Sequence, residues 1–139
     1  MTAVLVTGAG RGLGAAIAAA AVAEGWHVGV LDQDGAAARQ LSSRLGERAV
    51  ALTADTTDEA EVEAAFDRFA EATGQHAPDG VVANAGIVRF GPLIDLDVDA
   101  WRAVVEVNLT GTFLVARAAA RRMIAAGRPG SIVALTSMN

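Results

Sequence analysis

Five short apolar runs recur along the chain, and polar residues do not alternate within them. They occupy positions 4–6, 28–31, 49–52, 81–83 and 132–135. Apolar runs of this length are typical of strands that are covered on both faces, as in a parallel sheet between two layers of helix. The pattern therefore predicts five buried strands.

Segments with helical periodicity separate these runs. The clearest one has apolar residues at the spacing of a single helix face, namely Val62, Ala65, Phe66, Phe69 and Ala70. Thr56 and Glu59 precede it with the spacing of a capping pair. The alternation of strand and helix predicts right-handed crossovers and a parallel sheet. We expect a three-layer, doubly wound (Rossmann) α/β fold with strand order 3-2-1-4-5, truncated after the fifth strand.

The composition is that of one globular domain, because 53% of the 139 residues are hydrophobic and no linker interrupts them. The formal net charge of −5 opposes a nucleic-acid backbone or an anionic membrane, so we expect neither partner. The longest uncharged helical stretch, 13–23, is shorter than the ~20 residues that cross a bilayer, and no basic leader precedes the first strand. A cytoplasmic location is expected. Without cysteine, and with two histidines far apart, no metal site is expected either.

A glycine-rich loop follows the first apolar run and leads directly into a helix-forming segment. It contains Gly8, Gly10, Gly12 and Gly14. Glycine has no Cβ, so such a loop can bring its backbone N–H groups close to a pyrophosphate at the N-terminus of a helix. The loop lacks the Lys-Ser/Thr ending of a triphosphate-binding loop, and a flexible turn would be the alternative interpretation.

Asp32 ends the second apolar run, close to the ~20 residues beyond the glycines at which a carboxylate binds the ribose hydroxyls of NAD. It could instead cap the next helix, although Asp34 could serve that purpose. A carboxylate at this position would repel the 2′-phosphate of NADP. Arg11 favours NADP, but Gln33 and Asp34 offer no phosphate partner, so NAD is the expected cofactor and NADP the less favoured one.

Two motifs together resemble the short-chain dehydrogenase/reductase family. They are Thr7-Gly8-x-x-x-Gly12-x-Gly14 after the first strand and Asn84-Ala85-Gly86 after the fourth. The resemblance covers the whole chain, which would be the NAD(P)-binding Rossmann domain at residues 1–139, without the C-terminal part of the family fold. An S-adenosylmethionine methyltransferase also uses a glycine loop and an acidic residue after the second strand, but Thr7 and Asn84-Ala85-Gly86 count against it.

The resemblance implies a role for each motif residue. The pyrophosphate would lie against the loop residues Gly8, Gly10, Arg11, Gly12, Leu13 and Gly14. Asp32 would bind the adenosine ribose, and Asp55 and Thr56 would meet the adenine edge, although either could instead cap the third helix. Asn84, Ala85 and Gly86 would steady the centre of the sheet and pass along the nicotinamide ribose.

Two polar residues are candidates for catalysis. Asn108 shares a helical stripe with Trp101, Val104, Val105, Leu109, Thr112 and Phe113, so we expect it to be buried and fully hydrogen-bonded. It could bond the main chain, hold a water in the family's proton relay, or do both. By resemblance, Ser137 would orient the substrate, whereas a serine after a strand is more often a turn former. Trp101 is expected to pack.

The function implied by the resemblance is NAD(P)-dependent hydride transfer between the nicotinamide and a small-molecule alcohol or ketone. The family's Tyr-x-x-x-Lys would follow Ser137 by about a dozen residues, and the sequence ends at Asn139. We therefore expect this fragment to be inactive and the full-length form to be a homo-oligomer. The alternative is a non-catalytic dinucleotide-binding module or a degraded gene product.

Overall fold

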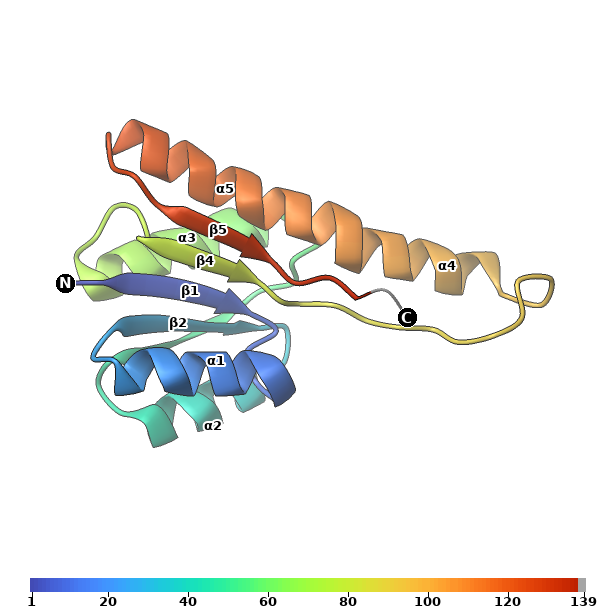
Figure 1. The fold of residues 1–139 in the computed structure, drawn as a ribbon, viewed down its shortest axis with the longest axis horizontal. Helices are drawn as coiled ribbons and strands as arrows, with labels where there is room; N and C mark the ends of the chain where they lie inside the picture. The colour runs from blue at the N-terminus through green and yellow to red at the C-terminus, as the bar shows by residue number, and fades with distance from the viewer. Residues whose placement is uncertain (138–139) are drawn as a thin grey trace.

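A five-stranded parallel sheet forms the centre of the molecule (Figure 1). The computed structural model describes residues 1–137. The strands are β1 (Ala3–Thr7), β2 (His27–Asp32), β3 (Ala49–Thr53), β4 (Gly80–Ala83) and β5 (Ser131–Ala134). Their order in the sheet is β3-β2-β1-β4-β5, with every pair parallel. The predicted fold class and strand order are confirmed.

Helices cover the sheet on both faces, as expected for three layers (Figure 1). One face carries α1 (Gly12–Ala23) and α2 (Gly35–Leu45). The opposite face carries α3 (Glu59–Thr73) and α5 (Thr112–Ala125). A further helix, α4 (Val98–Val105), continues through a π-helical segment, η1 (Glu106–Gly111), into α5 without a break.

The core alternates along each central strand, because successive side chains point to opposite faces of the sheet. In β1, Val4 and Val6 pack toward α1 and α2, whereas Leu5 packs toward α3 and α5. Gly29 of β2 lies so close to Phe69 that a Cβ there would be 2.8 Å from its ring. These strands are covered on both faces as predicted, but β5 is not, since Val133 is 49% exposed.

The cap of α3 differs from the sequence prediction. Asp58, and not Thr56, is the N-cap, and its carboxylate accepts a hydrogen bond from the Glu61 N–H at 3.0 Å. The helix begins at Glu59 because the chain turns at 55–58 before entering it. The prediction that Thr56 and Glu59 cap this helix is therefore wrong. Asp34 caps α2, accepting from the N–H groups of Ala36 and Ala37.

The stripe predicted on the long helix does not face the core. Trp101, Leu109 and Phe113 are exposed by 55%, 68% and 54%, so the prediction that Trp101 packs is wrong. A π-helix makes i to i+5 hydrogen bonds, so its residues rotate less per step than the 3.6-residue period assumes. After η1 the buried face consequently runs through Leu114, Val115, Ala118, Ala119 and Met123 instead. Trp26, in the turn after α1, is also 39% exposed.

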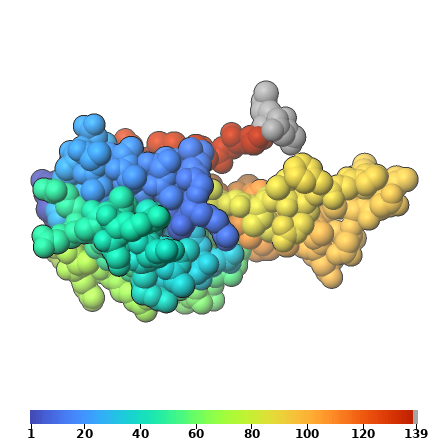
Figure 2. Space-filling model, turned by 90° about the horizontal axis from the view of Figure 1, so that it is seen from below, coloured from blue at the N-terminus to red at the C-terminus, as the bar shows by residue number. Residues whose placement is uncertain are grey.

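The N-terminal part of this helix and the preceding loop extend away from the body of the molecule (Figure 2). The extension exposes several large apolar side chains, among them Phe90, Leu93 and Ile94. By length and apolar composition alone, the continuous helix Val98–Ala125 would suffice to cross a membrane, a criterion that core helices of soluble proteins also meet. This helix is thus longer than residues 13–23, the longest uncharged helical stretch in the sequence.

Asp79 ties three strands together at the amino edge of the sheet. Its carboxylate accepts from the Ala3 N–H at 2.8 Å and from the Arg128 guanidinium at 2.6 Å, and its carbonyl accepts from the Ser131 N–H.

Asp79→Ala should lower the free energy of unfolding by about 1–3 kcal/mol, because two charge-assisted hydrogen bonds are lost. Urea unfolding measures the change. Asp95→Ala, in an exposed loop, should change stability by less than about 0.5 kcal/mol, and equal losses in both variants would contradict the prediction.

Candidate functional site

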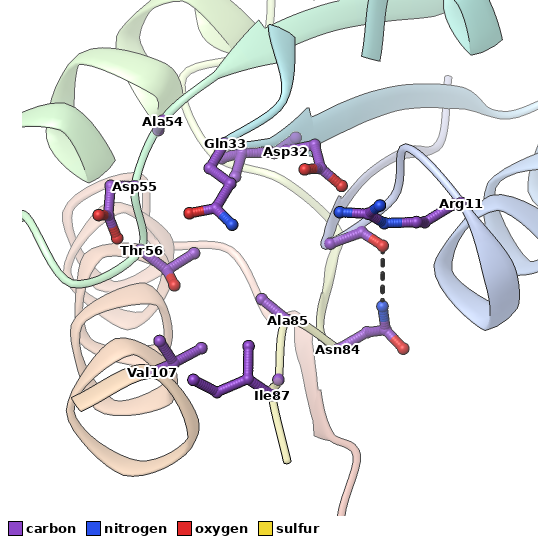
Figure 3. A pocket seen from close by; sticks show the side chains of 13 residues that line it. Arg11, Asp32, Gln33, Ala54, Asp55, Thr56, Asn84, Ala85, Ile87 and Val107 are labelled. Atoms are coloured by element: carbon purple, nitrogen blue, oxygen red, sulfur yellow. Dashed lines mark hydrogen bonds between the residues drawn. The ribbon is translucent and has the colours of Figure 1, made fainter. Parts of the chain in front are cut away.

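A cavity of about 300 Å³ opens at the carboxyl edge of the sheet (Figure 3). The segments that follow β1, β2, β3 and β4 form most of its wall, and Val107 of η1 closes one side. In open α/β sheets, ligands bind at this edge, where consecutive connections leave the sheet in opposite directions. Here that point lies between β1 and β4, since α1 covers one face and the helix after β4 covers the other.

Most of the residues proposed to bind cofactor meet at this cavity. Those that line it are Gly8, Arg11, Asp32, Asp55, Thr56, Asn84, Ala85 and Gly86. Gly10, Gly12, Leu13 and Gly14 lie beside it, in the glycine loop and the first turn of α1. The lining also includes five residues that the sequence did not single out as cofactor ligands: Leu31, Gln33, Ala54, Ile87 and Val107. Each of them lies next to a motif residue in the sequence or on the helix that carries Asn108, and this position could have indicated that it lines the cavity.

The glycines allow backbone segments to approach one another closely. A Cβ on Gly14 would lie 2.4 Å from the Gly8 carbonyl oxygen, and one on Gly8 would lie 2.9 Å from the Ala85 Cα. Gly8 also has a φ of 60°, a conformation that favours glycine. No larger residue fits at Gly8 or Gly14 without moving the backbone. Gly12, the first residue of α1, has a φ of 57° and no heavy atom within 4 Å of where its Cβ would lie, so space is open beside the N-terminus of α1, where an anionic group is favoured.

Thr7 and Asn84 join the ends of β1 and β4. The Thr7 hydroxyl, 1% exposed as a residue, accepts hydrogen bonds from the N–H groups of Asn84 and Ala85, each at 3.0 Å. In return, the Asn84 amide donates to the carbonyl oxygens of Thr7 at 2.9 Å and Gly8 at 3.2 Å. This reciprocal arrangement fixes the glycine loop against the segment after β4. It agrees with the expectation that Asn84 steadies the centre of the sheet.

The Asp32 carboxylate is buried, with 5% of the residue exposed, and faces the cavity (Figure 3). One oxygen accepts from the Gly10 N–H at 2.9 Å and the other from the Asp34 N–H at 3.0 Å. Each oxygen keeps a lone pair for a ligand hydroxyl. Arg11 lies on the same side of the cavity, and no ion pair joins it to Asp32 within residues 1–137. Asp32 does not cap α2, because Asp34 does.

Asp55 and Thr56 form the opposite wall of the cavity. Neither caps α3; the Asp55 carboxylate instead accepts from the N–H and the hydroxyl of Thr57, at 2.9 and 2.8 Å. The Asp55 N–H donates to the Glu61 carboxylate at 2.7 Å. Thr56 is buried, with 7% exposed. Glu61 was not singled out in the sequence, although the pattern Asp58-x-x-Glu61 is typical of a capping box.

Asn108 lies in η1 and is exposed, so the prediction that it is buried is wrong. Both its oxygen and its nitrogen are nevertheless hydrogen-bonded, although the oxygen keeps a second lone pair and the nitrogen a second N–H, so the prediction of full hydrogen bonding is confirmed only in part. Its oxygen accepts from the Ile87 N–H at 2.8 Å, and its nitrogen donates to the Ile87 carbonyl at 2.9 Å. The main-chain interpretation of Asn108 is therefore confirmed: the side chain holds the cavity-lining Ile87 from the neighbouring helix. A role in a proton relay stays a prediction.

Ser137 follows β5 at the same edge of the sheet, and its side chain is exposed. It is not part of the cavity lining within the described residues. Its proposed role in orienting a substrate stays a prediction.

The cavity fits a dinucleotide by two observations. The glycine cradle, the loop from Gly8 to Gly14, has open space at Gly12 beside the helix N-terminus, where a pyrophosphate would approach. The buried carboxylate of Asp32 stands beside that cradle with acceptor capacity left over. Asp55, Thr56, Asn84 and Ile87 are among the residues of the remaining walls.

Comparison with known proteins agrees with this geometry. The family model described as short chain dehydrogenase matches residues 2–139. The chain is 33% identical over 133 residues to sorbitol dehydrogenase of Cereibacter sphaeroides, covering 96% of this chain and 51% of that protein. It is 44% identical over 138 residues to cis-4-hydroxycyclohexanecarboxylate dehydrogenase of Sinomonas cyclohexanicum, of which it covers 54%.

Solved structures give the same result. A short-chain type dehydrogenase/reductase from Mycobacterium marinum matches with a TM-score of 0.93 and 30% identity, over 99% of this chain and 56% of that one. A 3-ketoacyl-(acyl-carrier-protein) reductase from Brucella melitensis, complexed with NADH, matches with a TM-score of 0.89 and 29% identity, over 98% and 57%. The chain thus spans about half the length of these relatives. Sequence, fold and site together show that the chain belongs to the short-chain dehydrogenase family.

Proposed function

We propose that this chain binds NAD(H) in the cavity and forms the cofactor-binding part of an oxidoreductase acting on an alcohol or ketone. The proposal is supported above all by the buried Asp32 carboxylate beside the glycine cradle. A carboxylate held by two backbone N–H groups stays in place to accept two vicinal ribose hydroxyls. Family membership also argues against the methyltransferase alternative.

The chain's own residues would bind and orient the cofactor. The loop of Gly8 to Gly14 would hold the pyrophosphate, and Asp32 the adenosine ribose. Asn84 would keep the loop in place through Thr7, while Asn108 would fix Ile87 along the path of the nicotinamide half. When bound, the nicotinamide supplies the hydride chemistry.

NAD is proposed over NADP because of charge. A 2′-phosphate would add negative charge next to the Asp32 carboxylate, and two charges at ~4 Å cost about 4 kcal/mol at an effective dielectric constant of ~20. Arg11 could offset part of this, since it lines the same cavity. That the Brucella melitensis reductase was crystallised with NADH is consistent with the proposal but belongs to that protein.

We also propose that the substrate is a small-molecule alcohol or carbonyl compound. The longer protein would be a homo-oligomer in the cytoplasm. Neither nucleic acid nor a membrane is proposed as a partner, in view of the net charge of −5.

The cofactor preference can be tested at Asp32. The wild-type chain should bind NADH at least about tenfold more tightly than NADPH, because of the repulsion described above. Asp32→Ser should weaken NADH and narrow this gap, since both the ribose acceptor and the negative charge are removed. Titration of the nicotinamide fluorescence measures both affinities. Asp95→Ser makes the same charge change in an exposed loop and should leave the gap intact; a wild-type preference for NADPH would refute the choice of NAD.

Residues 1–139 alone should bind NADH but show no dehydrogenase turnover. They contain no tyrosine, so they cannot supply the tyrosine that the family resemblance implies as general acid/base, a contribution of about 10²–10⁴ in rate. The assay supplies NAD and a panel of secondary alcohols and follows the absorbance of the reduced nicotinamide. Turnover that persists after host dehydrogenases have been removed would show that a residue of this chain replaces the tyrosine.

A further inference from the structure

The Glu61 side chain makes an unusual contact for its place in a helix. In a capping box, the acidic residue at the third helical position bonds the N–H of the N-cap residue. Here the N–H of the N-cap residue Asp58 donates to the Asp55 carbonyl at 3.1 Å instead. The Glu61 carboxylate reaches back further and accepts from the Asp55 N–H at 2.7 Å. Helix α3 is therefore joined directly to a residue of the cavity wall.

This contact completes a set of hydrogen bonds that fixes the Asp55 segment. One carboxylate oxygen of Asp55, Oδ1, is held by the N–H and the hydroxyl of Thr57. The main-chain N–H and carbonyl of Asp55 are held by Glu61 and Asp58. Within residues 1–137, no hydrogen bond uses the second carboxylate oxygen, Oδ2, or the N–H of Thr56. Asp55 and Thr56 both line the cavity (Figure 3), so the segment carries one unused acceptor and one unused donor on adjacent residues of the cavity wall.

An adjacent acceptor and donor discriminate between purine bases. Adenine offers an amino group as donor next to a ring nitrogen as acceptor, whereas a 6-oxopurine offers a carbonyl acceptor next to a ring N–H donor. The Asp55 carboxylate oxygen can accept from the amino group of adenine while the Thr56 N–H donates to the ring nitrogen. A 6-oxopurine would place acceptor against acceptor and donor against donor. The discrimination depends on how firmly the backbone between the two groups is held.

We propose that Glu61 is a positioning residue for recognition of the adenine base, acting through the backbone of Asp55. The proposal rests on the proposed function, because it assumes that a dinucleotide occupies the cavity. It assigns to Glu61 a role in selecting the base and none in contacting it. Loss of the Glu61 acceptor frees the Asp55 N–H and lets the donor and acceptor drift relative to each other.

The test compares two dinucleotides that differ only in the base. NADH and reduced nicotinamide hypoxanthine dinucleotide are titrated by nicotinamide fluorescence into the wild-type chain, Glu61→Ala, Glu61→Gln and Glu71→Ala. Glu71 lies exposed on the same helix, so Glu71→Ala is the matched control for loss of charge. Amide hydrogen exchange at Asp55, measured without ligand, reports the contact itself.

The wild-type chain should prefer NADH by about three- to tenfold, and Glu61→Ala should lose about that factor for NADH and less than twofold for the hypoxanthine analogue. Glu61→Gln should stay within twofold of wild type for both, because its amide oxygen can still accept the Asp55 N–H. Glu71→Ala should change neither affinity. Exchange of the Asp55 amide should accelerate in Glu61→Ala only.

Several outcomes would overturn the inference. Equal weakening of both dinucleotides in Glu61→Ala would show a general disturbance of the cavity, and unchanged affinity or unchanged Asp55 exchange would show that the contact has no effect. A Glu61→Gln variant as weak as Glu61→Ala would assign the effect to charge. A wild-type chain that binds neither dinucleotide would refute the proposed function and this inference together, whereas NADH binding that is insensitive to Glu61→Ala refutes this inference alone.

Discussion

The reciprocal hydrogen bonding between Thr7 and Asn84 is the interaction on which the site depends. A buried hydroxyl accepts two N–H groups, and the facing amide donates to two carbonyl oxygens. These bonds join β1 to β4 at the point where the crossovers leave for opposite faces of the sheet. Polar groups buried in this way are costly unless all are satisfied, so the pair specifies a single relative position for the two strand ends. The glycine loop is held in the same position, because the Asn84 amide also donates to the Gly8 carbonyl oxygen.

The sequence predicted those parts of the fold and site that follow from local rules. Short apolar runs separated by helical periods are enough to define a parallel sheet, and handedness then restricts the strand order. The glycine loop and Asp32 could be found because the loop follows the end of β1 and Asp32 is the last residue of β2. Parallel strands bring their carboxyl ends to one edge, so residues far apart in sequence could be assigned to one site without knowledge of any contact.

The remaining features depend on how elements meet. The π-helical segment changes the rotation per residue, so a stripe extrapolated through Asn108 to Phe113 arrives on the exposed face, while Trp101 is exposed because no residue of α4 is buried. Asp58 takes the cap because the chain turns at 55–58, a feature set by the loop that follows β3. The contact from Glu61 to the Asp55 N–H joins helix to loop. For none of these three features does composition or residue spacing favour the residue involved over the residues next to it in the sequence.

The positions of the two tryptophans have a consequence for spectroscopy. With no tyrosine in the sequence, the intrinsic ultraviolet emission of the chain comes from Trp26 and Trp101. Both are partly exposed, and neither lines the cavity. Trp26 lies at the amino edge of the sheet and Trp101 on the extension of the long helix. A ligand in the cavity would therefore touch neither indole, and only one that absorbs at the wavelengths of indole emission, such as a reduced nicotinamide, would quench that emission by energy transfer through space.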